Sequence, residues 1–159
     1  MSEELSAVPA TETAQVAALE QELAIEGVLV GIVMGSESDM PMMEKAAAEL
    51  TRRGIANEIQ VMSAHRNPDT VAEYAKTAQA RGLKVLIAGA GLAAALPGAV
   101  AAHTELPVIG VPLTSKTSVG GGIDALLAIA QMPPGVPVAC VGVDNPKNAA
   151  VLAARIIGA

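Results

Sequence analysis

The sequence predicts a three-layer α/β sandwich, in which helices cover both faces of a five-stranded parallel sheet. Two observations lead to this prediction. Short apolar runs of strand length alternate with longer segments whose apolar residues recur at helical spacing. Turns rich in Gly, Ser, Asn and Pro separate the two kinds of segment. Five successive strand–helix units favour a parallel sheet, because each helix must cross one face to reach the next strand.

The strands are predicted from the apolar runs. Residues 28–34 are apolar or Gly throughout, which is typical of a strand buried on both faces. The other predicted strands are residues 55–62, 85–88, 107–111 and 136–141. We expect the strand order 2-1-3-4-5, which is that of flavodoxin-like and related Rossmann-like folds.

The helices are predicted from capping residues, prolines and apolar periodicity. Asp39 is expected to cap a helix that ends near residue 53. Asn67-Pro68 and Asn145-Pro146 have the form of helix starts, and their helices are expected to end near residues 81 and 157. Two shorter helices are predicted at 97–103 and 123–131, the second after a Gly/Ser/Thr loop at 114–122.

The chain is predicted to hold one catalytic domain, residues 27–159, after an N-terminal extension, residues 1–26. The polar, small residues 1–12 predict disorder, whereas the apolar spacing within 13–25 predicts a short helix. This helix could pack on the domain or on a neighbouring subunit, or the extension could be an appendage added for purification or by design.

Composition excludes several classes of protein. The net charge is −6 and no Lys/Arg cluster is present, so we expect no nucleic-acid partner. The single cysteine, Cys140, favours a reducing cytoplasm. Neither a secretory signal nor a membrane-spanning apolar stretch is visible, so we expect no membrane association. The two distant histidines predict no metal site, and neither a P-loop nor a serine-hydrolase elbow occurs.

The candidate site lies at the carboxyl ends of the first three strands, because ligands of such folds bind near the point where the strand order reverses. The first turn offers hydroxyls, backbone amides and a helix N-terminus, which together suit an anion such as phosphate. The same residue types also form ordinary turns and caps. The candidate ligand-binding residues of this turn are Gly35, Ser36, Ser38 and Asp39.

The second turn contains Ser63, Ala64, His65 and Arg66. The Arg66 guanidinium suits a phosphate or carboxylate, and the His65 imidazole suits proton transfer near neutral pH. A solvated surface ring is the plain alternative for His65, but its position beside an arginine at a strand end favours a function. The other histidine, His103, lacks polar neighbours in the sequence and is interpreted as structural or interfacial.

The third turn, Gly89-Ala90-Gly91, imitates a dinucleotide-binding fingerprint, but the next strand lacks the acidic residue that a ribose would need. Its small residues are better explained by close approach of the backbone to a ligand or to another subunit. Ser115 and Lys116, in the loop after the fourth strand, could reach the site or be solvated.

Taken in order, these turns resemble the signatures of the family that includes bacterial carboxyaminoimidazole ribonucleotide mutases. Residues 34–39 match MGSxSD and residues 63–66 match SAHR. Leu92 and Ala95 stand where the family pattern GAGGAAHLPG has Gly and His. The resemblance covers about residues 28–157, and further matching segments are residues 88–91, 96–98, 107–112, 131–133 and 147–150.

The resemblance implies an isomerase of IMP biosynthesis that moves a carboxylate from the exocyclic nitrogen to the ring carbon of aminoimidazole ribonucleotide without a cofactor. It implies that Ser36, Asp39 and Arg66 bind the ribonucleotide and that His65 transfers the proton while carbon dioxide is held in a closed cavity. The Gly/Ala turn, residues 88–91, would contact the carboxylate. It also implies a homo-oligomer, an octamer in this family.

Several alternatives stay open at this point. A related carboxylase would use free carbon dioxide on aminoimidazole ribonucleotide, or on a nicotinate nucleotide, whose carboxylase shares an ALPG run such as residues 95–98. An inactive or redesigned assembly subunit is a further possibility. A signalling receiver would need an Asp where Gly89 stands, and a flavodoxin would need more aromatic residues than Tyr74.

Overall fold

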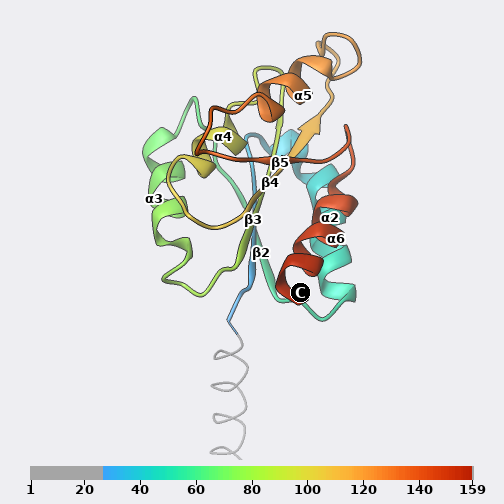
Figure 1. The fold of residues 1–159 in the computed structure, drawn as a ribbon. Coiled ribbons are helices and arrows are strands. Elements are labelled where there is room, and N and C mark those ends of the chain that lie inside the picture. The colour runs from blue at the N-terminus through green and yellow to red at the C-terminus, as the bar shows by residue number, and fades with distance from the viewer. Residues whose placement is uncertain (1–26, 159) are drawn as a thin grey trace, which may run out of the picture.

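The computed structural model describes residues 27–158, which form a parallel sheet between two layers of helices (Figure 1). Its strand order, β2-β1-β3-β4-β5, confirms the predicted fold and order. The predicted helix at 13–25 lies outside the described residues. The strands are β1 (Val30–Met34), β2 (Asn57–Val61), β3 (Val85–Gly91), β4 (Val108–Leu113) and β5 (Ala139–Cys140).

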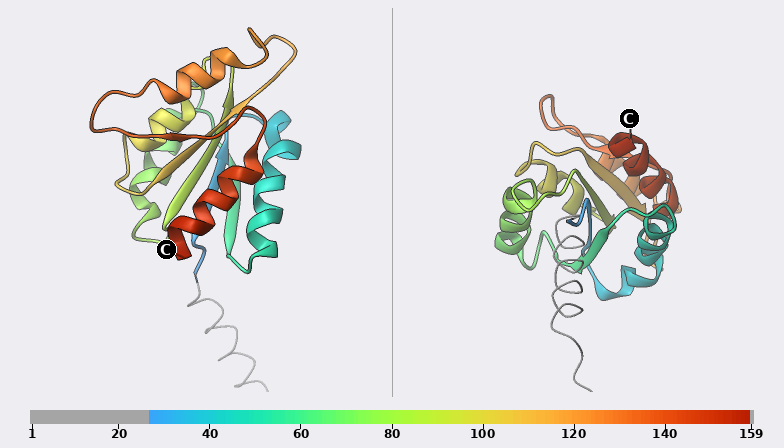
Figure 2. Two further views of the ribbon diagram at one scale, coloured as in Figure 1. Left: turned by 45° about the vertical axis from the view of Figure 1, so that its right-hand side comes forward. Right: turned by 90° about the horizontal axis from the view of Figure 1, so that it is seen from below.

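The helices divide between the two faces of the sheet (Figures 1 and 2). One apolar cluster joins the sheet to α2 (Met40–Arg52) and α6 (Pro146–Gly158). A second joins the opposite face to α3 (Pro68–Ala78), α4 (Leu96–Ala101) and α5 (Ile123–Ala130). Every residue of β1 is buried because its side chains alternate between these two clusters.

The strand β5 is shorter than the predicted 136–141, since only Ala139 and Cys140 pair with β4. The residues before it include Pro133, Pro134 and Pro137, which have no N–H to donate to a ladder. The edge of the sheet is therefore formed only where the chain leaves this proline-rich segment.

The strands β3 and β4 are longer than predicted and continue together to the edge where their carboxyl ends lie. Gly89 pairs with Val111, and Gly91 pairs with Leu113, so residues 89–91 extend β3 and do not form a turn. The first residues beyond the sheet on this side are accordingly those after Gly91 and after Leu113.

Candidate active site

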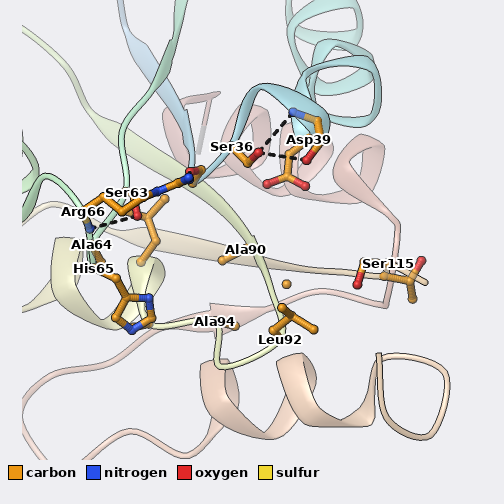
Figure 3. Close-up of a pocket in the computed structure, with 16 residues that line it drawn as sticks. Ser36, Asp39, Ser63, Ala64, His65, Arg66, Ala90, Leu92, Ala94 and Ser115 are labelled. Carbon is orange, nitrogen blue, oxygen red and sulfur yellow. Dashed lines mark hydrogen bonds between the residues drawn. The ribbon is translucent and has the colours of Figure 1, made fainter. Parts of the chain in front are cut away.

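A cavity of about 400 Å³ opens at the carboxyl ends of the strands, where all three predicted turns meet (Figure 3). This volume is within the range of small-molecule sites, roughly 300–1,000 Å³. Among the residues that line it are ten of the eleven predicted site residues: Gly35, Ser36, Ser38, Asp39, Ser63, Ala64, His65, Arg66, Ala90 and Gly91. The exception is Gly89.

Gly89 lies under the helix α2 and does not line the cavity. A Cβ atom at this position would stand 2.5 Å from the sulfur of Met43, closer than real side chains approach. The absence of a side chain at Gly89 therefore lets α2 pack against β3. Its small size is explained by helix packing, whereas close approach to a ligand or to another subunit was expected from the sequence.

The first turn is a short 3₁₀ segment, Glu37–Asp39, between β1 and α2. The Ser38 N–H donates to Ser36 Oγ at 3.3 Å, so Ser36 caps this segment. Asp39 precedes α2 but makes no side-chain cap bond, because its backbone is already helical. The expected cap at Asp39 is therefore wrong, and Figure 3 shows its carboxylate at the cavity.

Burial raises the pKa of the Asp39 carboxyl above its usual range, and a backbone hydrogen bond at Ser36 opposes part of this effect. A hydrogen-bond donor that approaches a partly desolvated carboxylate stabilises its charged form. Asp39 is therefore suited to accept hydrogen bonds from a ligand that enters the cavity.

The second turn is held by its own side chains and is joined to the first. The Arg66 N–H donates to Ser63 Oγ at 3.2 Å, and the Ser63 N–H donates to Asn67 Oδ1 at 3.3 Å. Arg66 Nη2 donates to the Gly35 carbonyl at 2.5 Å, which ties the two turns together across the sheet. No ion pair within residues 27–158 involves Arg66, so its charge is available to an anionic ligand.

His65 projects from this turn at the rim of the cavity (Figure 3). It is exposed, as is Arg66 beside it. The ring can therefore reach both a bound molecule and solvent, which a residue that exchanges protons requires.

The turn after β3 supplies a part of the wall that was not among the predicted site residues. Leu92, Ala94, Ala95 and Leu96 all line the cavity. Leu92 has φ +53° and Ala94 has φ +29°, values in the left-handed region that favours glycine. The replacement of the family glycine by Leu92 was the sequence signal that pointed to this turn.

The loop after β4 contributes Thr114 and Ser115 to the cavity, whereas Lys116 does not line it. The sequence did not decide whether Ser115 and Lys116 reach the site, and no sequence pattern indicated Thr114. Within residues 27–158, no three His, Cys, Asp or Glu side chains gather as metal ligands would. In the same residues, no helix has the length and apolar character needed to cross a membrane.

The fold and the cavity define a class: an α/β protein with a cavity of small-molecule size at the carboxyl ends of its parallel strands. The family model for AIR carboxylase matches residues 29–159. The chain therefore belongs to the AIR carboxylase family.

Relatives with known names agree with this assignment. The N5-carboxyaminoimidazole ribonucleotide mutase of Pyrococcus horikoshii is 58% identical over 130 residues, which are 82% of this chain and 72% of that protein. The phosphoribosylaminoimidazole carboxylase of Saccharomyces cerevisiae is 55% identical over 131 residues, 82% of this chain and 23% of that protein. The crystal structure of Treponema denticola PurE matches with a TM-score of 0.72 and 39% identity, covering 82% of this chain and 80% of that one.

Proposed function

We propose that this chain is an isomerase of purine biosynthesis that acts on N5-carboxyaminoimidazole ribonucleotide. It moves the carboxylate from the exocyclic nitrogen to the ring carbon of aminoimidazole ribonucleotide. The observation that supports this most is that the turns after β1 and β2 and the end of β3, which carry the three motifs, meet around one cavity. Relatives above 50% identity bear the name of this mutase.

The ribonucleotide is bound by the first two turns. Arg66, which forms no ion pair within residues 27–158, and the hydroxyls of Ser36 and Ser38 suit its phosphate. Asp39, whose carboxylate faces the cavity, suits the hydroxyls of the ribose. The Gly35 carbonyl and the Ser63 hydroxyl hold Arg66 in place, and Ala64 lines the cavity beside them.

His65 supplies and recovers one proton. Breaking the bond between nitrogen and carboxylate leaves its electron pair on the nitrogen, which takes a proton from the imidazolium as carbon dioxide departs. The ring carbon then attacks carbon dioxide, and the neutral imidazole removes that carbon's proton, which restores aromaticity. Because the proton is returned, the reaction needs no further acid or base.

Carbon dioxide must stay beside the ring between the two steps. The cavity wall at Ala90, Gly91 and Leu92 is small or apolar. We place the migrating carboxylate against this wall.

The test is turnover of N5-carboxyaminoimidazole ribonucleotide, followed by ultraviolet absorbance without bicarbonate. The native chain is expected to be active, and His65→Asn is expected to lower kcat by about 10²–10⁴-fold, the usual contribution of a positioned acid–base group. Ala95→His, which restores the family residue, tests whether that side chain adds to the rate. An inactive native chain would contradict the proposal and favour an assembly subunit. A His65→Asn variant at full rate would contradict the proton transfer by His65.

A second candidate is a carboxylase that adds free carbon dioxide to aminoimidazole ribonucleotide. The yeast relative named phosphoribosylaminoimidazole carboxylase supports it. Aminoimidazole ribonucleotide supplied with and without bicarbonate separates the two, because a mutase forms product from the N-carboxylated substrate without added bicarbonate. A nicotinate nucleotide belongs in the same assay as a third substrate.

We also propose that residues 27–159 form the catalytic domain of a cytoplasmic homo-octamer. An exposed apolar stripe, Val119, Ile123 and Leu127, supports association between subunits. The free cysteine Cys140 agrees with a reducing compartment. Cell fractionation would test the location, and the mass in solution would test the assembly.

A further inference from the structure

The Thr114–Ser115 segment lines the cavity, with Ser115 on the side away from His65 (Figure 3). A residue thirty positions later holds it there. Asp144 Oδ1 accepts a hydrogen bond from the Thr114 N–H at 2.9 Å, and Asp144 Oδ2 accepts one from the Thr114 hydroxyl. Both donors of Thr114 are therefore engaged by one carboxylate that does not itself line the cavity.

The backbone around Asp144 is built for this contact. Its φ is +52°, in the left-handed region, where Asp is among the few side chains that are tolerated. The Asp144 N–H donates to the Pro112 carbonyl at 2.9 Å, which fixes the residue beside the end of β4. This conformation turns the carboxylate toward the first residue after that strand.

The far end of the same loop also packs here. Gly122 has φ +102°, and a Cβ atom on it would stand 2.9 Å from Val143 and 3.0 Å from Thr114. The loop between Thr114 and Gly122 thus begins and ends against the Val143–Asp144 segment. Loss of the Asp144 carboxylate would free the end that reaches the cavity.

We propose that Asp144 is a positioning residue for ribonucleotide binding, because it holds Thr114 and Ser115 in the cavity wall. This inference rests on the proposed function. Since Ser115 lies on the side of the cavity away from His65 (Figure 3), the effect falls on substrate affinity and not on proton transfer. KM should therefore depend on Asp144, whereas kcat and its pH profile should not.

The main variant is Asp144→Gly, which removes both hydrogen bonds and suits the positive φ. We expect KM for N5-carboxyaminoimidazole ribonucleotide to rise about tenfold with kcat within about twofold, as loss of uniform binding predicts. The Kd of the product nucleotide, measured by calorimetry, should rise by the same factor. Asp144→Asn keeps one of the two acceptor oxygens. Its KM and Kd should lie between those of the native chain and those of Asp144→Gly.

The matched control is Asp124→Gly. That carboxylate accepts hydrogen bonds from the Val119 and Ala125 N–H groups at 3.1 and 2.9 Å, so it braces the same loop away from the cavity. Its removal should leave KM within about twofold of the native value. Should Asp144→Gly fail to fold, Thr114→Val tests the same contact, because it removes only the hydroxyl that donates to Asp144.

Amide hydrogen exchange gives a readout that needs no activity. Exchange at the Thr114 N–H should accelerate about tenfold or more in Asp144→Gly, with β1 and β3 unchanged. Faster exchange with unaltered KM and Kd, or a fall in kcat at constant KM, would overturn the inference. If the native chain binds the nucleotide without converting it, the proposed reaction fails, and the Kd comparison still decides the role of Asp144. A native chain that does not bind the nucleotide would overturn both.

Discussion

At the scale of single residues, Leu92 combines a disfavoured backbone with a place in the cavity wall. Its φ is +53°, and 47% of its surface is exposed. A left-handed conformation costs an L-residue roughly 1–2 kcal/mol, and such outliers gather at functional sites. The strain is retained here at a position where the family pattern has glycine, which suggests that the leucine side chain serves the cavity.

Leu92→Gly is expected to raise the free energy of unfolding by about 0.5–1 kcal/mol, because relief of strain exceeds the entropy cost of glycine, roughly 0.5–1 kcal/mol. Denaturant unfolding measures the change. Ala93→Gly is the control, since this exposed neighbour has no positive φ and should be destabilised instead. Equal destabilisation of both variants would show that Leu92 is not strained.

At the scale of elements, the helix α2 carries a nearly buried carboxylate at its carboxyl-terminal end. Glu49 Oε1 accepts from Arg52 Nη2 at 2.6 Å and from Arg53 Nε at 2.7 Å, and its side chain is 5% exposed. The hydrogen bonds from Arg52 and Arg53 lower the pKa of Glu49 to about 2, from an ordinary value of 4.5. The charged form of Glu49 is thus the one that the folded protein favours.

This lowered pKa sets the direction in which the stability of the folded protein changes with pH. A carboxyl whose pKa is lower in the folded state adds stability above its unfolded pKa, and the gain is lost as pH falls through the folded pKa. We expect the contribution of Glu49 to be complete at pH 7 and to disappear between about pH 4.5 and pH 2.

Thermal unfolding at pH 7 and near pH 2 compares the native chain with Glu49→Gln. The variant should be less stable than the native chain at pH 7 and closer to it in acid. Glu44→Gln, an exposed position on the same helix, is the control and should change little at either pH. A Glu49→Gln deficit that stays constant with pH would contradict this account.

At the scale of the whole molecule, apolar residues remain on the surface beside the sheet. Val119, Ile123 and Leu127 are 66%, 45% and 48% exposed and recur every fourth residue into α5. Ile123 and Leu127 lie one turn apart on the same side of α5, and Val119 lies in the loop before that helix. An exposed apolar stripe of this kind commonly marks an interface.

If the proposed assembly forms through this stripe, Leu127→Glu lowers the mass measured by light scattering toward the 15.9 kDa of one chain. The charge would be buried without a partner in an interface, but it is tolerated on a free surface. Circular dichroism checks that the fold is kept. Lys147→Glu, at an exposed position on α6, controls for the added charge. An unchanged mass for Leu127→Glu would exclude this stripe from the interface.

The sequence by itself determined the family, the layers of the fold and most of the residues around the cavity. The strand order was predicted from five strand–helix units, and the family model confirms the resemblance read from the turns. Local pattern suffices for these features, because apolar periodicity reports the element type and parallel strands bring their carboxyl ends to one edge. That rule located the turns that hold Ser36, Asp39, His65 and Arg66, and the family resemblance added the roles expected of these residues.

The tertiary structure alone decided the features that depend on contacts between distant residues. It assigned Gly89 to helix packing, since the Met43 side chain occupies the space beside it. It shortened β5 to the residues that pair with β4, and it joined Thr114 to Asp144 across thirty positions. The approach of two segments depends on how the crossover helices pack, and no local pattern in either segment records it.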